Sequence, residues 1–483
     1  MSRFNEKSNS PTKVENLAGG ESYVQTPELE LLSVLLTSFA KNEFYRDAED
    51  SFDRVKELIP NVNPEFAAKA TIYARNEFGM RSISHVMASE LAKYVSGKSW
   101  GKSFYDKVVR RVDDMTEIIS YHQARNGKIS NAMKDGFAKA FDKFDGYQLG
   151  KYRKEGKGVK LIDVVNMVHP EPVKKNAEAL KALVNDTLRS SGTWENELSK
   201  AGPDTDKKHD AWQGLLAERK IGYFALLRNL RNILQQAPDM VSLACDLLVD
   251  EKLIRNSLVL PFRYTTALQQ FSNNPDATSS IVQALNKAVD LSCANVPKFE
   301  GKTLVVCDYS GSMADGYNSH KYKASLFGAI FARANNSDFM IFGDSAEYLS
   351  FNPSDSTLSI VSQFVSNNQG WGARDRKGYV GHGTNFSAIF TEANKAYDRI
   401  LIFSDMQGWM GYNSPVSDFN SYKKEYNASP KVYSIDMAGY GTMQFPQSNV
   451  FCLAGFSEKI FDIMKYLETD KQALINTVNA IEL

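Results

Sequence analysis

The sequence of 483 residues contains little cysteine and no long apolar run. Its four cysteines, Cys245, Cys293, Cys307 and Cys452, stand at no spacing typical of a metal site. They indicate buried thiols in a reducing compartment rather than a disulfide framework. The chain has no stretch of about 18 uninterrupted apolar residues, as a membrane span requires, and Met1–Gln25 is too polar for a signal peptide. We therefore expect a soluble cytoplasmic protein.

Signatures of catalysis are also missing. A P-loop is excluded because Gly97-Lys98-Ser99 and Gly101-Lys102-Ser103 lack the upstream glycine at the required offset. The G-x-S-x-G elbow of serine hydrolases does not occur, and no cluster of carboxylates with histidine has nuclease-like spacing. We expect a protein that is not an enzyme.

The chain has no net charge, since 57 basic residues balance 57 acidic ones. This balance argues against a general nucleic-acid coat, but it conceals an asymmetry. The segment from Lys98 to Lys160 carries 15 Lys and Arg against 8 Asp and Glu, whereas residues from Glu300 to Glu482 are mildly acidic. Two parts of the chain are therefore expected to meet different partners.

The first 298 or so residues have the apolar spacing of successive helices. Thr26-Pro27 and Asn63-Pro64 are typical helix starts, with a capping residue followed by proline. Apolar stripes continue through residues 83–94, 212–219, 223–234, 240–248 and 281–291. Such a series favours an α-solenoid, in which each helix pair packs on the next; an irregular helical bundle is the alternative.

From about Lys298 the pattern changes to short apolar runs alternating with helical stretches. The expected strands are 303–307, 338–342, 399–403 and 431–435, and the expected helices are 320–334, 385–397, 417–426 and 458–480. Strands alternating with helices predict a parallel sheet covered on both faces. In such sheets ligands bind beyond the carboxyl ends of the strands.

Oxygen-bearing side chains fall at that edge. Asp308, Ser310 and Ser312 follow the first strand, Thr384 stands at the end of a glycine-rich loop, and Asp405 follows another strand. Hydroxyls and carboxylates are hard ligands of the kind that Mg²⁺ or Mn²⁺ prefers. The alternative is that Asp308 and the two serines only cap the following helix.

This set resembles the metal-ion-dependent adhesion site of von Willebrand factor A-type (vWA) domains, which all five positions match. The resemblance implies that Ser310 and Ser312 bind the ion directly. Thr384 would bind it directly or through water, and Asp308 and Asp405 would hold the coordinating waters or the ion itself. The cofactor implied is Mg²⁺, with Mn²⁺ as the alternative.

The helical part resembles TROVE-domain proteins of the Ro ribonucleoprotein type, of a bacterial or phage kind. Trp212 and the following Gly222–Ile233, which contains LLRNLRNI, are similar to segments of that family, as are the LPFR stretch at 260–263 and the GFS segment at 455–457. The resemblance divides the chain into a flexible arm (1–25), a helical TROVE domain of HEAT-like repeats (26–298) and an α/β vWA-like domain with a parallel sheet (299–483). It implies a helical ring clasped by the α/β domain.

The same resemblance implies partners. Proteins of this family bind small structured non-coding (Y-like) RNAs on a basic outer surface, and single-stranded 3′ ends of misfolded RNAs enter the hole of the ring. Bacterial members work with exoribonucleases. We expect these partners here, with no membrane association and a monomeric chain.

Candidate RNA-binding residues carry over in part. Lys151 and His169 match the family's KYK…SH-x-KP segment, and Arg153 and Lys154 lie in the same stretch. A second basic position of that segment falls near Glu155, where Lys154 or Lys157 could substitute. A solvated helix face is the alternative for these lysines.

Other candidates depend on charge alone. His122 and Arg125 could join this patch. Arg228, Arg231 and Arg263 stand among apolar residues and could line the hole, binding phosphates bidentately. They could equally tie adjacent repeats together.

Two further functions compete with RNA binding. The chain could be a protein-interaction adaptor whose metal site captures an acidic ligand, with the helices as a passive frame. A metal-dependent nuclease is a third interpretation.

Overall fold

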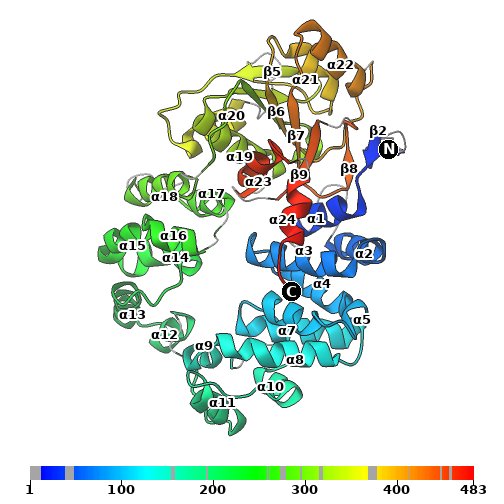
Figure 1. Cartoon of the computed structure of the whole chain (residues 1–483). Coiled ribbons are helices and arrows are strands. Elements are labelled where there is room, and N and C mark those ends of the chain that lie inside the picture. Colours follow the sequence, from blue (N-terminus) through cyan, green and yellow to red (C-terminus); the bar gives the residue numbers. More distant parts are fainter. Residues whose placement is uncertain are drawn as a thin grey trace.

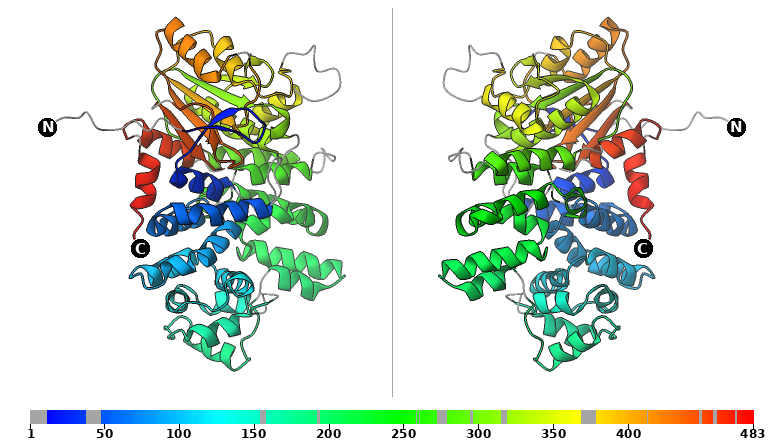
Figure 2. Two further views of the ribbon diagram at one scale, coloured as in Figure 1. Left: turned by 90° about the vertical axis from the view of Figure 1, so that its right-hand side faces the viewer. Right: turned by 90° about the vertical axis from the view of Figure 1, so that its left-hand side faces the viewer.

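The computed structural model describes residues 12–37, 48–153, 158–191, 194–257, 259, 261–271, 279–293, 296–314, 319–367, 378–411, 413–446, 449–455, 459–470 and 472–483. The helices of the first 292 residues follow one another around a ring rather than packing into a single bundle (Figure 1). A domain built on a β-sheet completes the ring. Side views place this domain above successive layers of helices (Figure 2). The helical region and the sheet domain predicted from the sequence are thus confirmed.

The first side of the ring runs from the sheet domain to its far end. It contains α1 (Pro27–Thr37), α2 (Ala48–Leu58), α3 (Pro64–Asn76), α4 (Ser82–Glu90), α5 (Ala92–Val95), α6 (Gly101–Val108), α7 (Val112–Arg125), α8 (Asn131–Ala140), α9 (Gly146–Lys151), α10 (Leu161–Val168) and α11 (Ala177–Val184). The second side returns to the sheet domain. It contains α12 (Trp194–Ala201), α13 (Thr205–Ala217), α14 (Tyr223–Gln236), α15 (Val241–Leu248), α16 (Glu251–Ser257), α17 (Phe262–Gln269) and α18 (Ser279–Ser292).

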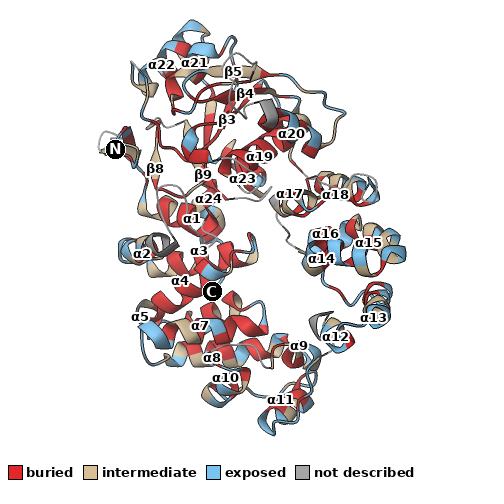
Figure 3. Cartoon of the chain, turned by 180° about the vertical axis from the view of Figure 1, so that it is seen from behind, coloured by how far each residue is buried: buried red, intermediate tan, exposed pale blue. Residues whose placement is uncertain are grey.

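Local chemistry accounts for where these helices begin. The side chain of Asn63 accepts a hydrogen bond from the N–H of Glu65, and Pro64 occupies the first position of α3, where a missing N–H costs nothing. Ser130 caps α8 in the same way, by accepting from the N–H of Met133. Burial is dense in α1 to α8 and thinner in α12 and α13 (Figure 3).

The sheet of the second domain has six strands in the order β5-β4-β3-β6-β7-β9. They are β3 (Thr303–Asp308), β4 (Asp338–Phe342), β5 (Ala346–Leu349), β6 (Arg399–Ser404), β7 (Lys431–Asp436) and β9 (Val450–Ala454). The four strands predicted from the sequence are present and parallel. The sheet is nonetheless mixed, because β5 returns antiparallel to β4 after a short turn. The predicted parallel sheet is therefore present, with one antiparallel strand added at that edge.

Alternate residues of the strands face two different cores. Val305 and Leu401 pack into the core that continues into the helical ring, whereas Val306 and Ile402 face a smaller core on the other side. The first face is covered by α19 (His320–Asn335), α20 (Thr357–Asn367) and α23 (Lys459–Leu467), and the second by α21 (Phe386–Glu392) and α22 (Pro415–Glu425). Both faces being covered explains why the strands are almost entirely apolar.

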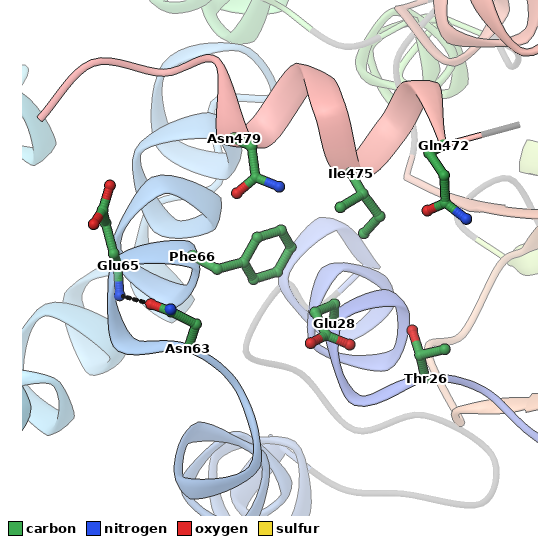
Figure 4. Close-up of a pocket in the computed structure, with 8 residues that line it drawn as sticks. All are labelled: Thr26, Glu28, Asn63, Glu65, Phe66, Gln472, Ile475 and Asn479. Carbon is green, nitrogen blue, oxygen red and sulfur yellow. Dashed lines mark hydrogen bonds between the residues drawn. The ribbon is translucent and has the colours of Figure 1, made fainter. Parts of the chain in front are cut away.

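Contacts at two places close the ring. On one side, the carboxylate of Asp290 in α18 accepts hydrogen bonds from Arg333 and Thr357 of the sheet domain, both at 2.7 Å. On the other side, α1 lies against β9, and α24 (Ala473–Asn479) lies along α3. A cavity of about 480 Å³ remains between α1, α3 and α24, where Phe66 and Ile475 lie on facing sides (Figure 4).

The N-terminal segment differs from the prediction of a flexible arm over residues 1–25. Within it, residues 12–25 are ordered: β1 (Lys13–Glu15) and β2 (Glu21–Val24) form a hairpin, and β2 pairs antiparallel with β8 (Thr442–Met443). Pairing with a distant strand supplies the backbone partners that the short hairpin lacks by itself. Residues 1–11 lie outside the described residues.

Two expected helices are shorter than predicted. Two helices, α23 and α24, stand in place of the single helix expected over 458–480, and α21 ends at Glu392 rather than Tyr397. None of the helices in the described ranges is long and apolar enough to cross a lipid bilayer.

Candidate functional site

The turn after β3 brings three predicted metal ligands together. Asp308 ends the strand, and its Oδ1 accepts a hydrogen bond from the N–H of Ser310 at 2.8 Å. The hydroxyl of Ser310 lies 3.2 Å from that of Ser312, and all three side chains are buried. The short 3-10 helix of Gly311–Met313 begins after Ser310 without a hydrogen bond from a capping side chain, and α19 is capped by Ser319, which accepts from the N–H of Tyr322. The capping alternative for Ser310 and Ser312 is therefore wrong.

The loop that carries Thr384 lies beside this turn. The N–H of Gly311 donates to the carbonyl of His382 at 2.8 Å. Thr384 is buried, and its carbonyl accepts from the N–H groups of Trp409 and Met410, both at 3.2 Å. The Thr384 loop is thus fixed between the turn after β3 and the loop after β6.

Asp405 follows β6 and completes the group. The hydroxyl of the preceding Ser404 donates to Asp308 Oδ2 at 2.5 Å, which links the two strands. Asp405 Oδ1 accepts from the N–H of Gln407 at 3.2 Å. Asp405 Oδ2 is buried and has no hydrogen-bond partner among the residues that the structure describes.

The electrostatics of the cluster favour a cation. Burial raises the pKa of Asp308, and burial together with the neighbouring Asp308 raises the pKa of Asp405. A buried carboxylate whose pKa is raised by a second carboxylate lacks sufficient positive charge nearby, although Lys321 acts to lower the pKa of Asp308. An ion between them would neutralise both and would satisfy Asp405 Oδ2. The five residues therefore fit a hard divalent cation.

The ligand set is rich in hydroxyls and has only two carboxylates. In the described part of the chain, no three or more His, Cys, Asp or Glu side chains gather as a metal cluster. Hydroxyl and carboxylate oxygens remain suitable ligands for Mg²⁺ or Mn²⁺. With so few charged ligands, a bound ion would remain able to attract an anionic group from a partner.

A second candidate site is a cavity of about 510 Å³ between the two sides of the ring. Its lining includes Arg75, Arg81, Arg110, Arg111, Phe224 and Arg263. The first four arginines come from α3 and from the segments that precede α4 and α7, and the last two residues come from α14 and α17. The cavity thus joins basic residues from opposite sides of the ring.

Two aspartates hold the arginines of the first side. Asp114 accepts from Arg75 at 2.8 Å and from Arg81 at 3.2 Å, and Asp113 accepts from Arg81 and Arg111. Burial acts to raise the pKa of Asp114, but the hydrogen bond with His85 and the charge of Arg75 outweigh it and hold that pKa well below its usual range. Asp114 is therefore ionised, and the two aspartates fix the guanidinium groups in place.

Positive charge remains in excess in this cavity. Burial and the nearby Arg75 lower the pKa of Arg110. Burial and the nearby Arg228 lower the pKa of Arg263. Cations that disfavour one another's charge in a cavity indicate room for an anion.

Phe224 presents an aromatic surface opposite the four arginines. Its side chain is 43% exposed, and the guanidinium carbons of Arg228 and Arg263 lie 5.7 and 5.9 Å from its ring centroid. Arg228 thus reaches the site through Phe224 although it does not line the cavity. Arg231 is exposed on the same helix.

The residues of the predicted outer RNA site have different surroundings in the structure. Lys151 ends α9 with its ammonium 5.5 Å from the ring centroid of Tyr152. His169 is exposed at the end of α10. Arg153 donates to the carbonyl of Leu188 and pairs with Asp186 at 2.6 Å, so internal contacts account for its side chain. Lys154 and Lys157 lie outside the described residues.

His122 and Arg125 have different surroundings although both lie on α7. His122 is buried; its Nδ1 lies 3.0 Å from the Ser89 hydroxyl and its Nε2 lies 3.1 Å from the Lys128 carbonyl. Its ring nitrogens are thus engaged inside the protein. Arg125 is exposed and stacks on Tyr121, 5.2 Å from its ring centroid.

Sequence reasoning missed the four arginines of the first side and the residues that support the cation site. Arg110 and Arg111 belong to the basic segment, but no pattern shows that they face Phe224. Asp344 accepts from the N–H of Gly383 at 2.5 Å and so supports the Thr384 loop. Asp344 could have been found from the sequence, because it is a carboxylate just after an expected strand and lies at the same sheet edge.

Comparisons with known proteins agree with this architecture. The TROVE domain family matches residues 186–280. The crystal structure of the Deinococcus radiodurans Ro (Rsr) protein superposes with a TM-score of 0.59 at 17% identity, covering 89% of this chain and 97% of that one. Telomerase protein component 1 of mouse is 21% identical over 338 residues, and that of rat is 20% identical over the same length. These alignments cover 51% of this chain and only 13% of either rodent protein.

The fold defines a class of helical-ring proteins completed by a domain with a mixed sheet. Within that class, residues 186–280 match the TROVE domain family, and the chain has the fold of the Ro protein. The resemblance predicted from the sequence motifs is thereby confirmed. The matched segment 186–280 contains Phe224, Arg228, Arg231 and Arg263.

Proposed function

We propose that this protein is a non-catalytic RNA-binding protein of the Ro type that holds single-stranded RNA in its ring. The observation that carries the proposal is the cavity in which Arg75, Arg81 and Arg110 face Phe224 and Arg263. Guanidinium groups bind phosphates through paired hydrogen bonds, and an exposed aromatic ring stacks on any base. A site of this kind favours single strands, whose bases are free to stack.

The RNA proposed for this cavity is the single-stranded 3′ end of a misfolded RNA, for quality control or turnover. An exoribonuclease is the proposed protein partner. The outer surface around Lys151, Arg125 and His169 is proposed to bind a structured, Y-like RNA. The exposure of Arg125 and His169 supports this assignment.

The sheet domain is proposed to bind Mg²⁺, or Mn²⁺, through Ser310, Ser312 and Thr384, with Asp308 and Asp405 holding water ligands or the ion. When bound, the ion supplies an open position for a carboxylate or phosphate oxygen. The protein's own groups shape the site: the Ser404 hydroxyl orients Asp308, and the N–H of Gln407 orients Asp405.

A second function follows from that site. The pair of buried carboxylates supports an adaptor that captures an acidic partner through the ion. Chelation would then release the partner while leaving RNA in the ring, which separates this function from RNA binding.

The decisive experiment measures RNA affinity with Phe224→Ala. The RNA probe is a stem with a single-stranded 3′ tail, and the same stem with a blunt end is the comparison. Loss of a stacked base weakens binding by about 5- to 150-fold, so the variant should lose the preference for the tail. Tyr466→Ala is the matched control, since Tyr466 is an aromatic residue 62% exposed on α23 and outside the cavity.

The wild type should bind the tailed RNA more tightly, with an affinity that falls steeply as salt rises. Equal, weak binding of both RNAs by the wild type would reject the RNA function. A tail preference that survives in Phe224→Ala would reject this cavity as the site.

A further inference from the structure

The N-terminal hairpin touches the loop that carries Asp405. The turn between β1 and β2 begins at Asn16, which is buried. Asn16 Oδ1 accepts from the N–H groups of Ala18 and Gly20, and its Nδ2 donates to the carbonyl of Gly408 at 2.7 Å. The same side chain therefore shapes the turn and binds the Asp405 loop.

Gly20 shows how close the two segments are. A Cβ at this position would overlap the carbonyl oxygen of Gly408 and would lie 2.8 Å from the Cα of Trp409. Only glycine allows this approach of backbone to backbone. The hairpin is thus fitted to the loop along its main chain.

Gln407 connects the hairpin to Asp405. Its Oε1 accepts from the N–H of Leu17 at 2.8 Å, and its own N–H donates to Asp405 Oδ1 at 3.2 Å. Its Nε2 donates to the carbonyl of Asp405 at 3.1 Å and to the Thr442 hydroxyl at 3.0 Å. Gln407 is completely buried, so its amide has one arrangement in which these bonds are made.

The strand that holds the hairpin also holds the loop. β8 pairs with β2, and the adjacent Gln444 donates from Nε2 to the carbonyl of Met406 at 2.7 Å. The Asp405 loop is therefore fixed between the first and the last parts of the chain.

We propose that the hairpin of residues 13–24 positions the divalent-cation site, acting through Gln407 on Asp405, so that cation affinity depends on hairpin docking. This inference rests on the proposed cation site. The physical reason is preorganisation: without the hairpin, the loop must become ordered when the ion binds, and that ordering reduces affinity. Gln407 is a positioning residue, because it acts on the ion only through Asp405.

Leu17→Pro removes the single N–H that donates to Gln407. The carbonyl of Asn16 accepts from the N–H of Gly19 at 3.0 Å, which defines a β-turn with Leu17 at its second position, where proline is favoured. The exchange therefore deletes the donor while keeping the turn. Leu17→Ala is the matched control, because it shortens the same half-exposed side chain and retains the N–H.

The measurement is calorimetric titration of the chelator-treated, full-length protein with Mn²⁺. Leu17→Pro should bind Mn²⁺ about tenfold more weakly than Leu17→Ala, as expected for the loss of one partly buried hydrogen bond. The melting temperature of each variant in EDTA is recorded in parallel, because a merely structural hairpin would lower it without changing Mn²⁺ affinity.

A second pair of variants tests the same proposal if Leu17→Pro does not fold. Asn16→Ala removes the bond to Gly408, and Lys13→Ala is its control on the outer strand. Mn²⁺ affinities equal to those of the controls would overturn the role of the hairpin while the cation site stands. A wild type that binds no Mn²⁺ would overturn both, but would leave the RNA function untouched.

Discussion

The carboxylate of Asp114 lies 2.8 Å from the guanidinium of Arg75, and both side chains are buried between α3 and α7. Asp114 also accepts the backbone N–H groups of Arg110 and Arg111, at 3.0 and 2.9 Å. Because Arg81 also donates to Asp114, at 3.2 Å, one buried carboxylate supports four of the arginines that line the ring cavity. Asp114 therefore contributes both to the stability of the fold and to the arrangement of the residues that line the cavity.

Asp114→Ala should lower the free energy of unfolding by about 3–5 kcal/mol, because it leaves the charge of Arg75 buried without its partner. Urea denaturation measures this change. Asp142→Ala is the control, since Asp142 pairs with Lys139 at the surface, where such pairs contribute about 0–1 kcal/mol. An equal effect of the two variants would contradict the assignment.

Stability should decrease at acid pH through the same residue. The pKa of Asp114 is held below that of the unfolded chain, near 4. Its contribution is therefore complete above about pH 4 and is lost progressively as the pH falls toward the folded-state pKa. Unfolding midpoints from pH 7 to pH 3 should fall less steeply in Asp114→Asn than in the wild type.

Asp405→Asn should have opposite effects with and without cation. In EDTA it should raise the free energy of unfolding by on the order of 1 kcal/mol, because it removes one of two buried like charges. With Mg²⁺ at about 100 times its Kd, the wild type should gain about 2.7 kcal/mol and the variant none. Thermal unfolding in both buffers measures this, and equal gains would reject Asp405 as a ligand.

Lys151→Glu and Arg153→Glu should act differently although two positions separate them. Lys151→Glu should weaken binding of a structured RNA and make the salt dependence less steep by about one unit, at unchanged stability. Arg153→Glu should instead lower the melting temperature, since it breaks the contacts with Asp186 and Leu188. Filter binding at several salt concentrations and a melting curve separate the two effects.

The sequence predicts the gathering of the oxygen-bearing side chains at the sheet edge better than it predicts the ring cavity, for a physical reason. Asp308 and Asp405 each follow a parallel strand, and parallel strands place their carboxyl ends at one edge. Their meeting therefore follows from local pattern alone. Arg110 and Phe224 meet only because the ring curves, and the curvature depends on every helix pair between them.

The elements that sequence reasoning missed have weak local signals. β5 is partly exposed, and β8 has only two residues. The sequence of the hairpin is typical of a polar tail, because it has few apolar side chains. The hairpin is held in place by Gln407 and β8, which are remote in sequence. Pairing between such distant segments produces no periodic pattern of apolar residues from which the strands could be predicted.

The docking of Gln25 on Thr442 joins positions that are 417 residues apart in the sequence. During synthesis, the first hairpin emerges long before its partner strand exists. Contacts between such distant residues carry the largest loop-closure cost and form late. We therefore expect closure of the ring to be a late step of folding.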